Sequence, residues 1–258
     1  MYERAERTGR VVVHTTWGEW LTATLPDPAL RSLLGRDWPR HRQAPTPPRR
    51  LVFAVSRMVI KYTAAAVLET APDALDIAYQ PGGRPMLRGF GEELHLSLAH
   101  TEELIVVAVS QNGPVGVDTE SVTRKASHDL LRTHVCTPEE AATLDALPDD
   151  ERTTHFLRLW TLKEAYTKAL GQGIRRRFSA VGFCWDPQGH PVLADVFEPA
   201  RTWSSATHLV QDRYLASEAQ QRVTVEPRSR TALDRLANPG LPPATTVVFP
   251  GPGRPGRR

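Results

Sequence analysis

Apolar positions set the pattern in the first half of the chain. Between residues 50 and 68 they recur at helical spacing with no glycine or proline inside, which predicts an amphipathic helix. The preceding segment, 34–50, is polar and rich in proline and arginine, which predicts a loop. Short β-branched or apolar runs predict strands, and a polar link between the last two predicts a hairpin. These runs cover residues 11–24, 75–80, 94–100 and 104–110, with a turn at 81–85.

The second half combines helices with further strands. A charged loop is predicted at 121–128, and residues 151–170 predict a long helix that ends at Gly171. Thr137 and Glu140, with Pro138 between them, predict a helix start with a capping box. The strands predicted in this half cover residues 115–120, 179–185 and 190–197, with short β segments between 200 and 225.

Composition places the chain among ordinary globular proteins. It has 258 residues, 40% hydrophobic and 24% charged. No apolar run is expected to reach the roughly 18 residues of a membrane span, and the charged N-terminus lacks the apolar stretch of a signal peptide. We therefore expect a cytoplasmic protein without a membrane partner. Cys136 and Cys184 have no metal-type spacing and are predicted to be buried free thiols.

The basic charge is concentrated at the C-terminal end. The net charge is +3, but residues 227–258 hold six arginines and one acid, a net of +5, so the rest sums to −2. Such a distribution argues against a nucleic-acid partner. Proline and glycine are frequent in the same segment and predict disorder. We expect an N-terminal half at 1–116, a C-terminal half at 117–226 and a disordered tail at 227–258.

The segment GVDTE at 116–120 carries the first candidate chemistry. Alternate residues of a strand point to the same face, so Asp118 and Glu120 lie side by side. A divalent cation would relieve the repulsion between these carboxylates and gain two oxygen ligands. The alternative is a strand end with solvated acids.

The segment WTLKEAYTK at 160–168 adds a third carboxylate. On a helix, Trp160, Lys163, Glu164 and Lys168 are expected to share one face, with Trp160 in a packing role. Glu164 would complete a hard-cation site, and the lysines would hold phosphates. The alternative is a solvated helix face with an ordinary Glu–Lys pair.

These two segments, about 40 residues apart, resemble the motifs of the larger, Sfp-like 4'-phosphopantetheinyl transferases. Three other stretches are also similar to that family. They are RRLVFAVSRMVIK at 49–61, GGRPML at 82–87 and LSLAHT at 96–101. The resemblance implies an α+β fold of two similar halves in a pseudo-two-fold arrangement. Each half would pack a small, mostly antiparallel sheet on helices, with coenzyme A between the halves.

The resemblance also implies an activity and its residues. The 4'-phosphopantetheine arm of coenzyme A would move to a serine of an apo acyl or peptidyl carrier protein, releasing 3',5'-ADP, and the enzyme would be a monomer. Magnesium, with manganese as the alternative ion, would bind Asp118, Glu120 and Glu164. Glu164 would be the base, directly or through water, with Asp118 and Lys168 as its catalytic partners. The expected coenzyme A contacts are Arg49 (or Arg50 by a one-residue shift), Arg57, Arg84, His100, Lys163 and Lys168.

Two other functions remain open from the sequence. One is a metal-dependent phosphohydrolase acting on coenzyme A or on a holo-carrier protein, since the same carboxylates and lysines would serve it. The other is a non-catalytic module that binds coenzyme A or a carrier protein.

Overall fold

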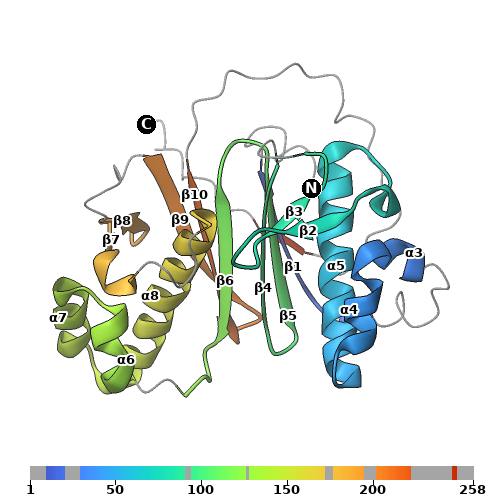
Figure 1. The fold of residues 1–258 in the computed structure, drawn as a ribbon. Coiled ribbons are helices and arrows are strands. Elements are labelled where there is room, and N and C mark those ends of the chain that lie inside the picture. Colours follow the sequence, from blue (N-terminus) through green and yellow to red (C-terminus); the bar gives the residue numbers. More distant parts are fainter. Residues whose placement is uncertain are drawn as a thin grey trace.

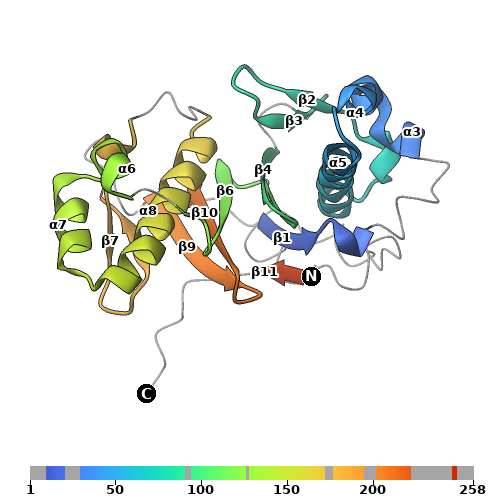
Figure 2. The ribbon, with the colours of Figure 1, turned by 90° about the horizontal axis from the view of Figure 1, so that it is seen from below.

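The computed structural model describes residues 10–20, 30–90, 94–125, 128–171, 177–194, 202–221 and 246–248. Two antiparallel sheets lie face to face between two long helices, so the molecule has four layers (Figures 1 and 2). The first sheet has the strand order β11-β1-β5-β4, and the second has the order β6-β10-β9. Helix α5 covers the outer face of the first sheet, and α8 covers that of the second.

The two halves share one topology. In each, a strand is followed by a long helix, a two-stranded hairpin and two further strands, of which the last occupies the centre of the sheet. The predicted α+β class with two similar halves is confirmed. The first half contains β1 (Arg10–Thr16), α5 (Pro47–Leu68), β2 (Ile77–Tyr79), β3 (Pro85–Leu87), β4 (His95–Thr101) and β5 (Leu104–Ser110). The second contains β6 (Val115–Ser121), α8 (Asp149–Ala169), β7 (Phe183–Trp185), β8 (Pro191–Leu193), β9 (Trp203–Val210) and β10 (Tyr214–Gln221).

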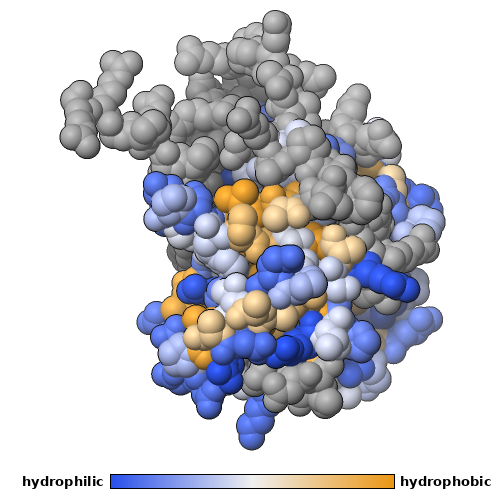
Figure 3. Space-filling view, turned by 90° about the vertical axis from the view of Figure 1, so that its left-hand side faces the viewer, coloured by the Kyte–Doolittle hydropathy of each residue, from blue (hydrophilic) through white to orange (hydrophobic). Residues whose placement is uncertain are grey.

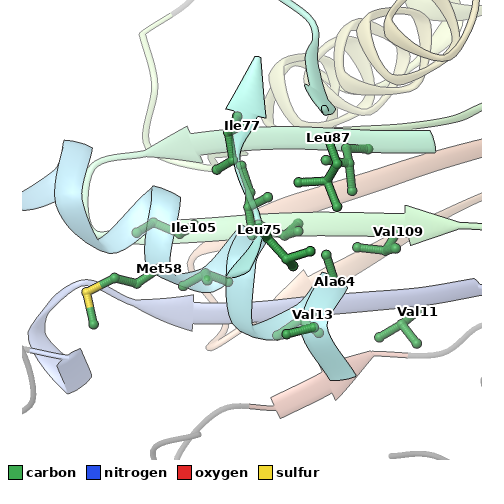
Figure 4. Packing of buried hydrophobic residues seen from close by; sticks show 14 of the residues in the cluster. Val11, Val13, Met58, Ala64, Leu75, Ile77, Leu87, Ile105 and Val109 are labelled. Carbon is green, nitrogen blue, oxygen red and sulfur yellow. The ribbon is translucent and has the colours of Figure 1, made fainter. Parts of the chain in front are cut away.

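Alternation along the strands explains the layering. On β1, Val11 and Val13 pack toward α5, whereas Val12 packs toward the second sheet. All seven residues of β5 are buried, because this central strand is covered on both faces. Figure 4 shows the cluster on the α5 side, where Met58 and Ala64 of the helix meet valines of β1 and β5.

Most predicted elements are present, with shifted ends. The β4–β5 hairpin, the helix at 50–68, the helix at 151–170 and the two strands of the β7–β8 hairpin are confirmed. The strand at 75–80 and the turn at 81–85 are also present, but the pairing of β2 with the short strand β3 was not predicted. The capping box of α7 (Pro138–Ala146) is present as predicted, with the Thr137 and Glu140 side chains each accepting from the other's backbone N–H. Helix α6 (His128–Val135) was not predicted.

The loop predicted at 34–50 is wrong. This segment contains part of α3 (Leu30–Leu34), the 3₁₀ turn η2 (Gly35–Asp37), α4 (Trp38–Gln43) and the start of α5. Three of its four prolines, at 39, 47 and 48, lie in the first turns of α4 and α5, where a missing backbone N–H costs no helical hydrogen bond. They therefore begin helices here, and Thr46 caps α5 by accepting from the backbone N–H of Arg49.

Two further expectations need correction. Cys136 is buried, but Cys184 is exposed on the short strand β7. Residues Thr246–Val248, inside the predicted disordered tail, form β11 and pair with β1. Other parts of predicted segments lie outside the described residues, namely 21–24, 126–127, 195–197, 222–225 and the remainder of the tail.

Helix α5 alone, among the residues that the structure covers, is long and apolar enough to cross a membrane. The expectation that no segment would reach this length and hydropathy is therefore wrong. In the structure 67% of its apolar window is buried, as in the core helix of a folded protein.

Seen from the side of α6, α7 and α8, the surface gathers hydrophobic side chains near its centre, with hydrophilic ones around them (Figure 3).

Candidate active site

The GVDTE segment lies on β6, an edge strand that packs directly against α8. Val115 and Val117 point into the core between the sheets, so Gly116, Asp118 and Glu120 face the helix side. A Cβ atom on Gly116 would lie 1.9 Å from the carbonyl oxygen of Ala165 and 2.6 Å from the backbone nitrogen of Ala169. Glycine is therefore required here, and the close approach brings the carboxylates of β6 to the surface of α8.

On α8, Glu164 and Lys168 are one turn apart on the face that meets β6. The ammonium group of Lys168 donates to Asp118 Oδ1 at 2.6 Å and to the Val117 carbonyl oxygen at 3.2 Å. The Lys168 side chain keeps 31% of its exposure, against 12% for Asp118. The structure thus brings Asp118 and Lys168 into direct contact and places Glu164 one turn before Lys168 on the same face of α8.

The two carboxylates of this group favour a proton or a cation. Burial, together with the charge of Asp118, raises the pKa of Glu164 above its ordinary value. Burial also raises the pKa of Asp118, although the ammonium group of Lys168 acts in the opposite direction. Close carboxylates with raised pKa values are typical of sites that hold cations or transfer protons.

The contact predicted for Lys163 is not formed. Its side chain is fully buried and donates to Glu140 Oε2 at 2.5 Å and to the carbonyl oxygens of Val135 and Phe178. A helix turns by about 100° per residue, so Lys163 and Lys168 are about 140° apart on α8 and do not share a face. Lys163 therefore points toward α6 and α7, away from the carboxylates.

The third predicted metal ligand, Glu120, is paired with a cation. Arg124 donates to Glu120 Oε1, and its guanidinium carbon lies 5.5 Å from the centre of the Trp160 ring. Within the described part of the chain, no three His, Cys, Asp or Glu residues are grouped so as to hold a metal ion. Asp118 and Glu164 suit magnesium, which commonly takes one or two carboxylates with water and phosphate oxygens. Glu120 is paired with Arg124 in this structure, and its contact uses only Oε1.

The first half contributes positive charge to the same region. Arg57, on α5, is 9% exposed, and His100 lies near the end of β4. Desolvation, together with the charges of Arg57 and Lys168, lowers the pKa of His100. The charges of one cation of α5 and one cation of α8 therefore both act on this histidine. The junction of the halves also contains a hydrogen bond from the Val117 N–H to Ser97 Oγ.

The other two predicted arginines have different environments. Arg84 donates to the Ala169 carbonyl oxygen at 3.1 Å and lies 3.4 Å from His95 Nδ1. It therefore joins the β2–β3 hairpin to the end of α8, and burial lowers the pKa of its guanidinium. Arg49 is exposed in the first turn of α5, whereas the neighbouring Arg50 donates to the Ala44 carbonyl oxygen.

Several residues around these groups were not predicted from the sequence. Asp37 and Tyr79 hold Arg57, Arg124 pairs with Glu120, and Glu140 pairs with Lys163. Asp37 could have been noticed as the single acid among the arginines of 36–50. Tyr79 offered no such signal, because it comes close to Asp37 only through the packing of β2 near α4 and α5.

The fold and site define an α+β protein with paired carboxylates and cations where its two halves meet, an arrangement suited to phosphate chemistry. Residues 114–223 match the family model described as "4'-phosphopantetheinyl transferase superfamily". The resemblance predicted from the sequence is confirmed over this part of the chain.

Among curated proteins, the chain is similar to 4'-phosphopantetheinyl transferases. It is 30% identical to HetI of Nostoc over 60% of this chain and 63% of that protein. It is 32% identical to AcpT of Escherichia coli K12 over 50% of this chain and 62% of that protein. It is 26% identical to the Bacillus subtilis transferase over 56% of this chain and 64% of that protein. The chain thus covers less than two thirds of each relative.

Solved structures show a partial likeness. A holo-(acyl-carrier-protein) synthase from Bacillus anthracis, solved with CoA (3',5'-ADP), matches with a TM-score of 0.39 and 19% identity over 43% of this chain and 96% of that one. The holo-[acyl-carrier-protein] synthase of Helicobacter pylori, solved with coenzyme A, gives a TM-score of 0.33 and 16% identity over 42% and 98% of the two chains.

Proposed function

We propose that this chain is a 4'-phosphopantetheinyl transferase that acts on coenzyme A and an apo carrier protein. The observation that carries the proposal is the group formed by Asp118, Glu164 and Lys168, which lies on β6 and α8 where the two halves meet. The superfamily match over the same strand and helix supports it.

The proposed reaction moves one phosphoryl-linked arm. The carrier serine Oγ bonds to the phosphorus that bears the pantetheine, and the bond from that phosphorus to the bridging oxygen breaks. The arm leaves coenzyme A, and 3',5'-ADP departs with the bridging oxygen. Glu164 takes the serine proton, directly or through water. Lys168 stabilises charge on the phosphate oxygens.

Magnesium is part of the proposal. Asp118 and Glu164 would hold the ion, and Glu120 would join them once Arg124 moves away. Bound there, it would supply charge neutralisation at the phosphate oxygens. The pairing of Asp118 with Lys168 and of Glu120 with Arg124 supports this role, because each cation lies where a carboxylate needs a positive neighbour.

The setting is proposed with the activity. The enzyme would work as a monomer in the cytoplasm and would modify acyl or peptidyl carrier domains of polyketide or non-ribosomal peptide biosynthesis. Neither nucleic acid nor a membrane has a part in the proposed reaction.

The test is a transfer assay. The protein is incubated with coenzyme A, magnesium and several unrelated apo carrier proteins, and intact carriers are weighed by mass spectrometry. We expect a gain of one phosphopantetheine arm, stoichiometric release of 3',5'-ADP, and loss of both with a chelator. No gain on any carrier would overturn the transferase proposal.

Variants of the site sharpen the assay. We expect Glu164→Gln and Lys168→Met each to lower kcat by about 100-fold, the usual size of a lost base or charge stabiliser. Glu151→Gln is the matched control, since Glu151 is exposed in the first turn of the same helix. Equal effects of Glu164→Gln and Glu151→Gln would contradict the assigned role.

The same mixtures separate the alternatives. A phosphohydrolase would release 3',5'-ADP and free phosphopantetheine without a carrier protein, or would remove the arm from a holo-carrier. A binding module would retain coenzyme A in a titration but leave carrier masses unchanged.

A further inference from the structure

A buried carboxylate in the first half organises two arginines. Asp37, at the end of η2, is 4% exposed. Its Oδ2 accepts from the Tyr79 hydroxyl at 2.9 Å and from Arg57 Nε at 3.4 Å. Its Oδ1 accepts from Arg40 Nη1 at 3.5 Å. One carboxylate thus anchors groups from α4, α5 and β2.

Aromatic rings fix the same guanidinium groups from the side. The guanidinium carbon of Arg57 lies 3.9 Å from the centre of the Phe53 ring, and that of Arg40 lies 4.4 Å from the centre of the Tyr79 ring. Stacking of this kind restricts a guanidinium group to one plane. The Tyr79 hydroxyl also donates to Asp37 while accepting from Arg57 Nε at 2.9 Å.

The cluster of Asp37, Arg40 and Arg57 has a net positive charge and retains hydrogen-bond donors that are not used within it. Two arginines share one carboxylate, and Nε is the atom through which Arg57 is anchored. Its terminal nitrogens donate to no residue that the structure describes, although the side chain is only 11% exposed. The charge of Arg57 also acts on His100 of β4, which places the two side chains in the same region of the molecule.

We propose that Asp37 and Tyr79 are positioning residues that hold Arg57, with Arg40 beside it, for binding a phosphate monoester of the nucleotide substrate. The inference rests on the proposed function in one respect, because the monoester would be the 3'-phosphate of coenzyme A. Two planar guanidinium groups with fixed orientation suit a phosphate monoester, which accepts paired hydrogen bonds. Arg40 and both anchors were absent from the residues predicted by sequence.

The test compares two nucleotides that differ by one phosphate. The full-length protein is titrated calorimetrically with 3',5'-ADP and with 5'-ADP. We expect the wild type to prefer 3',5'-ADP. Asp37→Asn and Tyr79→Phe should weaken 3',5'-ADP binding, by about tenfold for Asp37→Asn, and leave 5'-ADP within about twofold. Arg40→Gln should reduce the same preference.

Arg36→Gln is the matched control. Arg36 is a neighbouring arginine with a 72% exposed side chain, paired with Asp76 instead of Asp37, and its loss should leave both affinities unchanged. Equal weakening of both nucleotides by Asp37→Asn would indicate a purely structural role and overturn the inference. A wild type without preference would also overturn it. If Asp37→Asn fails to fold, Tyr79→Phe decides, and an unchanged preference there counts against the proposal.

The transfer assay separates this inference from the proposed function. In that assay Asp37→Asn should raise the KM for coenzyme A while kcat changes little. A wild type that modifies carriers, with variants that lose both nucleotides equally, overturns only the positioning role. A wild type that selects 3',5'-ADP but modifies no carrier overturns the transferase proposal and leaves the positioning role standing.

Discussion

Lys163 belongs to the segment that predicted the active site, but its role in the structure is to stabilise the fold. Its ammonium group is completely buried, and its acceptors are one carboxylate and two backbone carbonyl oxygens. Glu140 Oε1 accepts from the Phe183 N–H as well, while its Oε2 completes the cap of α7. The pair therefore joins α7, α8 and β7, and it stabilises the helix that carries Glu164 and Lys168.

Removing one partner of this pair should be costly. Lys163→Met leaves the Glu140 carboxylate buried without its counterion, which typically lowers the free energy of unfolding by about 3–5 kcal/mol. Urea denaturation measures the loss, and Lys125→Met, at an exposed lysine, should change stability by less than about 0.5 kcal/mol.

Kinetics distinguish this role from the phosphate contact predicted by sequence. Below its unfolding temperature, Lys163→Met should keep the KM of the wild type for coenzyme A. A large rise in KM with unchanged stability would restore the phosphate contact and contradict the buried structural role.

Sequence could predict the carboxylates and Lys168, but not their partners. Asp118, Glu164 and Lys168 follow from the period of one strand and one helix, each of which depends on local spacing. The anchoring of Arg57 by Asp37 and Tyr79 depends on three elements meeting, and so does the burial of Lys163 against Glu140. Such contacts cannot be predicted from the spacing of residues along the chain, because they join residues that are far apart in sequence and become buried only when the elements pack.

At the scale of elements, the contact between β6 and α8 determines the site. Gly116 allows the backbone of the strand to lie against Ala165 and Ala169. The small side chains of the helix keep the distance short, so Asp118 reaches Lys168. The glycine of the GVDTE segment thus has a packing function, and the positions of the candidate active-site residues depend on it.

Gly116→Ala should separate the two elements. Its Cβ would meet backbone atoms that cannot rotate away, so we expect a loss of about 3 kcal/mol in the free energy of unfolding, at the upper end for overpacking. Transfer activity should also fall, since Glu164 and Lys168 move with α8. Gly18→Ala is the control, because the nearest atom to its Cβ would be Thr16 Oγ1 at 3.9 Å. Equal stability of the two variants, measured by thermal denaturation, would refute the packing argument.

Elements were predictable where local chemistry decides them. The capping box at Thr137 and the apolar hairpin of β4 and β5 are set by neighbouring residues. The prolines at 39, 47 and 48 were misinterpreted because proline is compatible both with loops and with the first turn of a helix. Strand β11 was missed because its short apolar run lies among prolines and glycines, and its pairing partner β1 lies more than 200 residues earlier.

At the scale of the whole molecule, the repeated topology extends to buried lysines. Lys61 of α5 donates to the Leu33 carbonyl oxygen, and Lys163 of α8 donates to the Val135 carbonyl oxygen. Each lysine thus ties the long helix of its half to the segment that precedes it. The sequence contains no residue-level repeat that would have predicted this symmetry. The two halves share the order of their elements but not their sequence pattern.

The two sheets are joined by a buried ion pair on their facing surfaces. Arg10 of β1 lies 3.4 Å from Glu218 of β10, and both side chains are less than 10% exposed. His14 and His208 line a small cavity with Glu218. Burial raises the pKa of Glu218 to about 7, although Arg10 acts against this rise. Burial lowers the pKa of both histidines.

These directions determine how stability depends on pH. A carboxyl whose folded pKa is raised binds more protons in the folded state than in the unfolded state between about pH 4.5 and 7. Its contribution is therefore fully present below that range and is lost as pH rises through about 7. The histidines have lowered pKa values and act in the opposite direction, so stability gained from them increases as pH rises through their ordinary range.

Glu218→Gln isolates the carboxyl from the histidines, which are present in both proteins. We expect the stability of the variant relative to wild type to increase between pH 5 and pH 8, by on the order of 3 kcal/mol. Urea denaturation at intervals of half a pH unit measures the difference. A difference that is constant with pH would mean that Glu218 is ionised throughout and that Arg10 outweighs its burial. The expected slope would instead mean that the junction between the sheets, next to which coenzyme A is proposed to bind, weakens as Glu218 ionises.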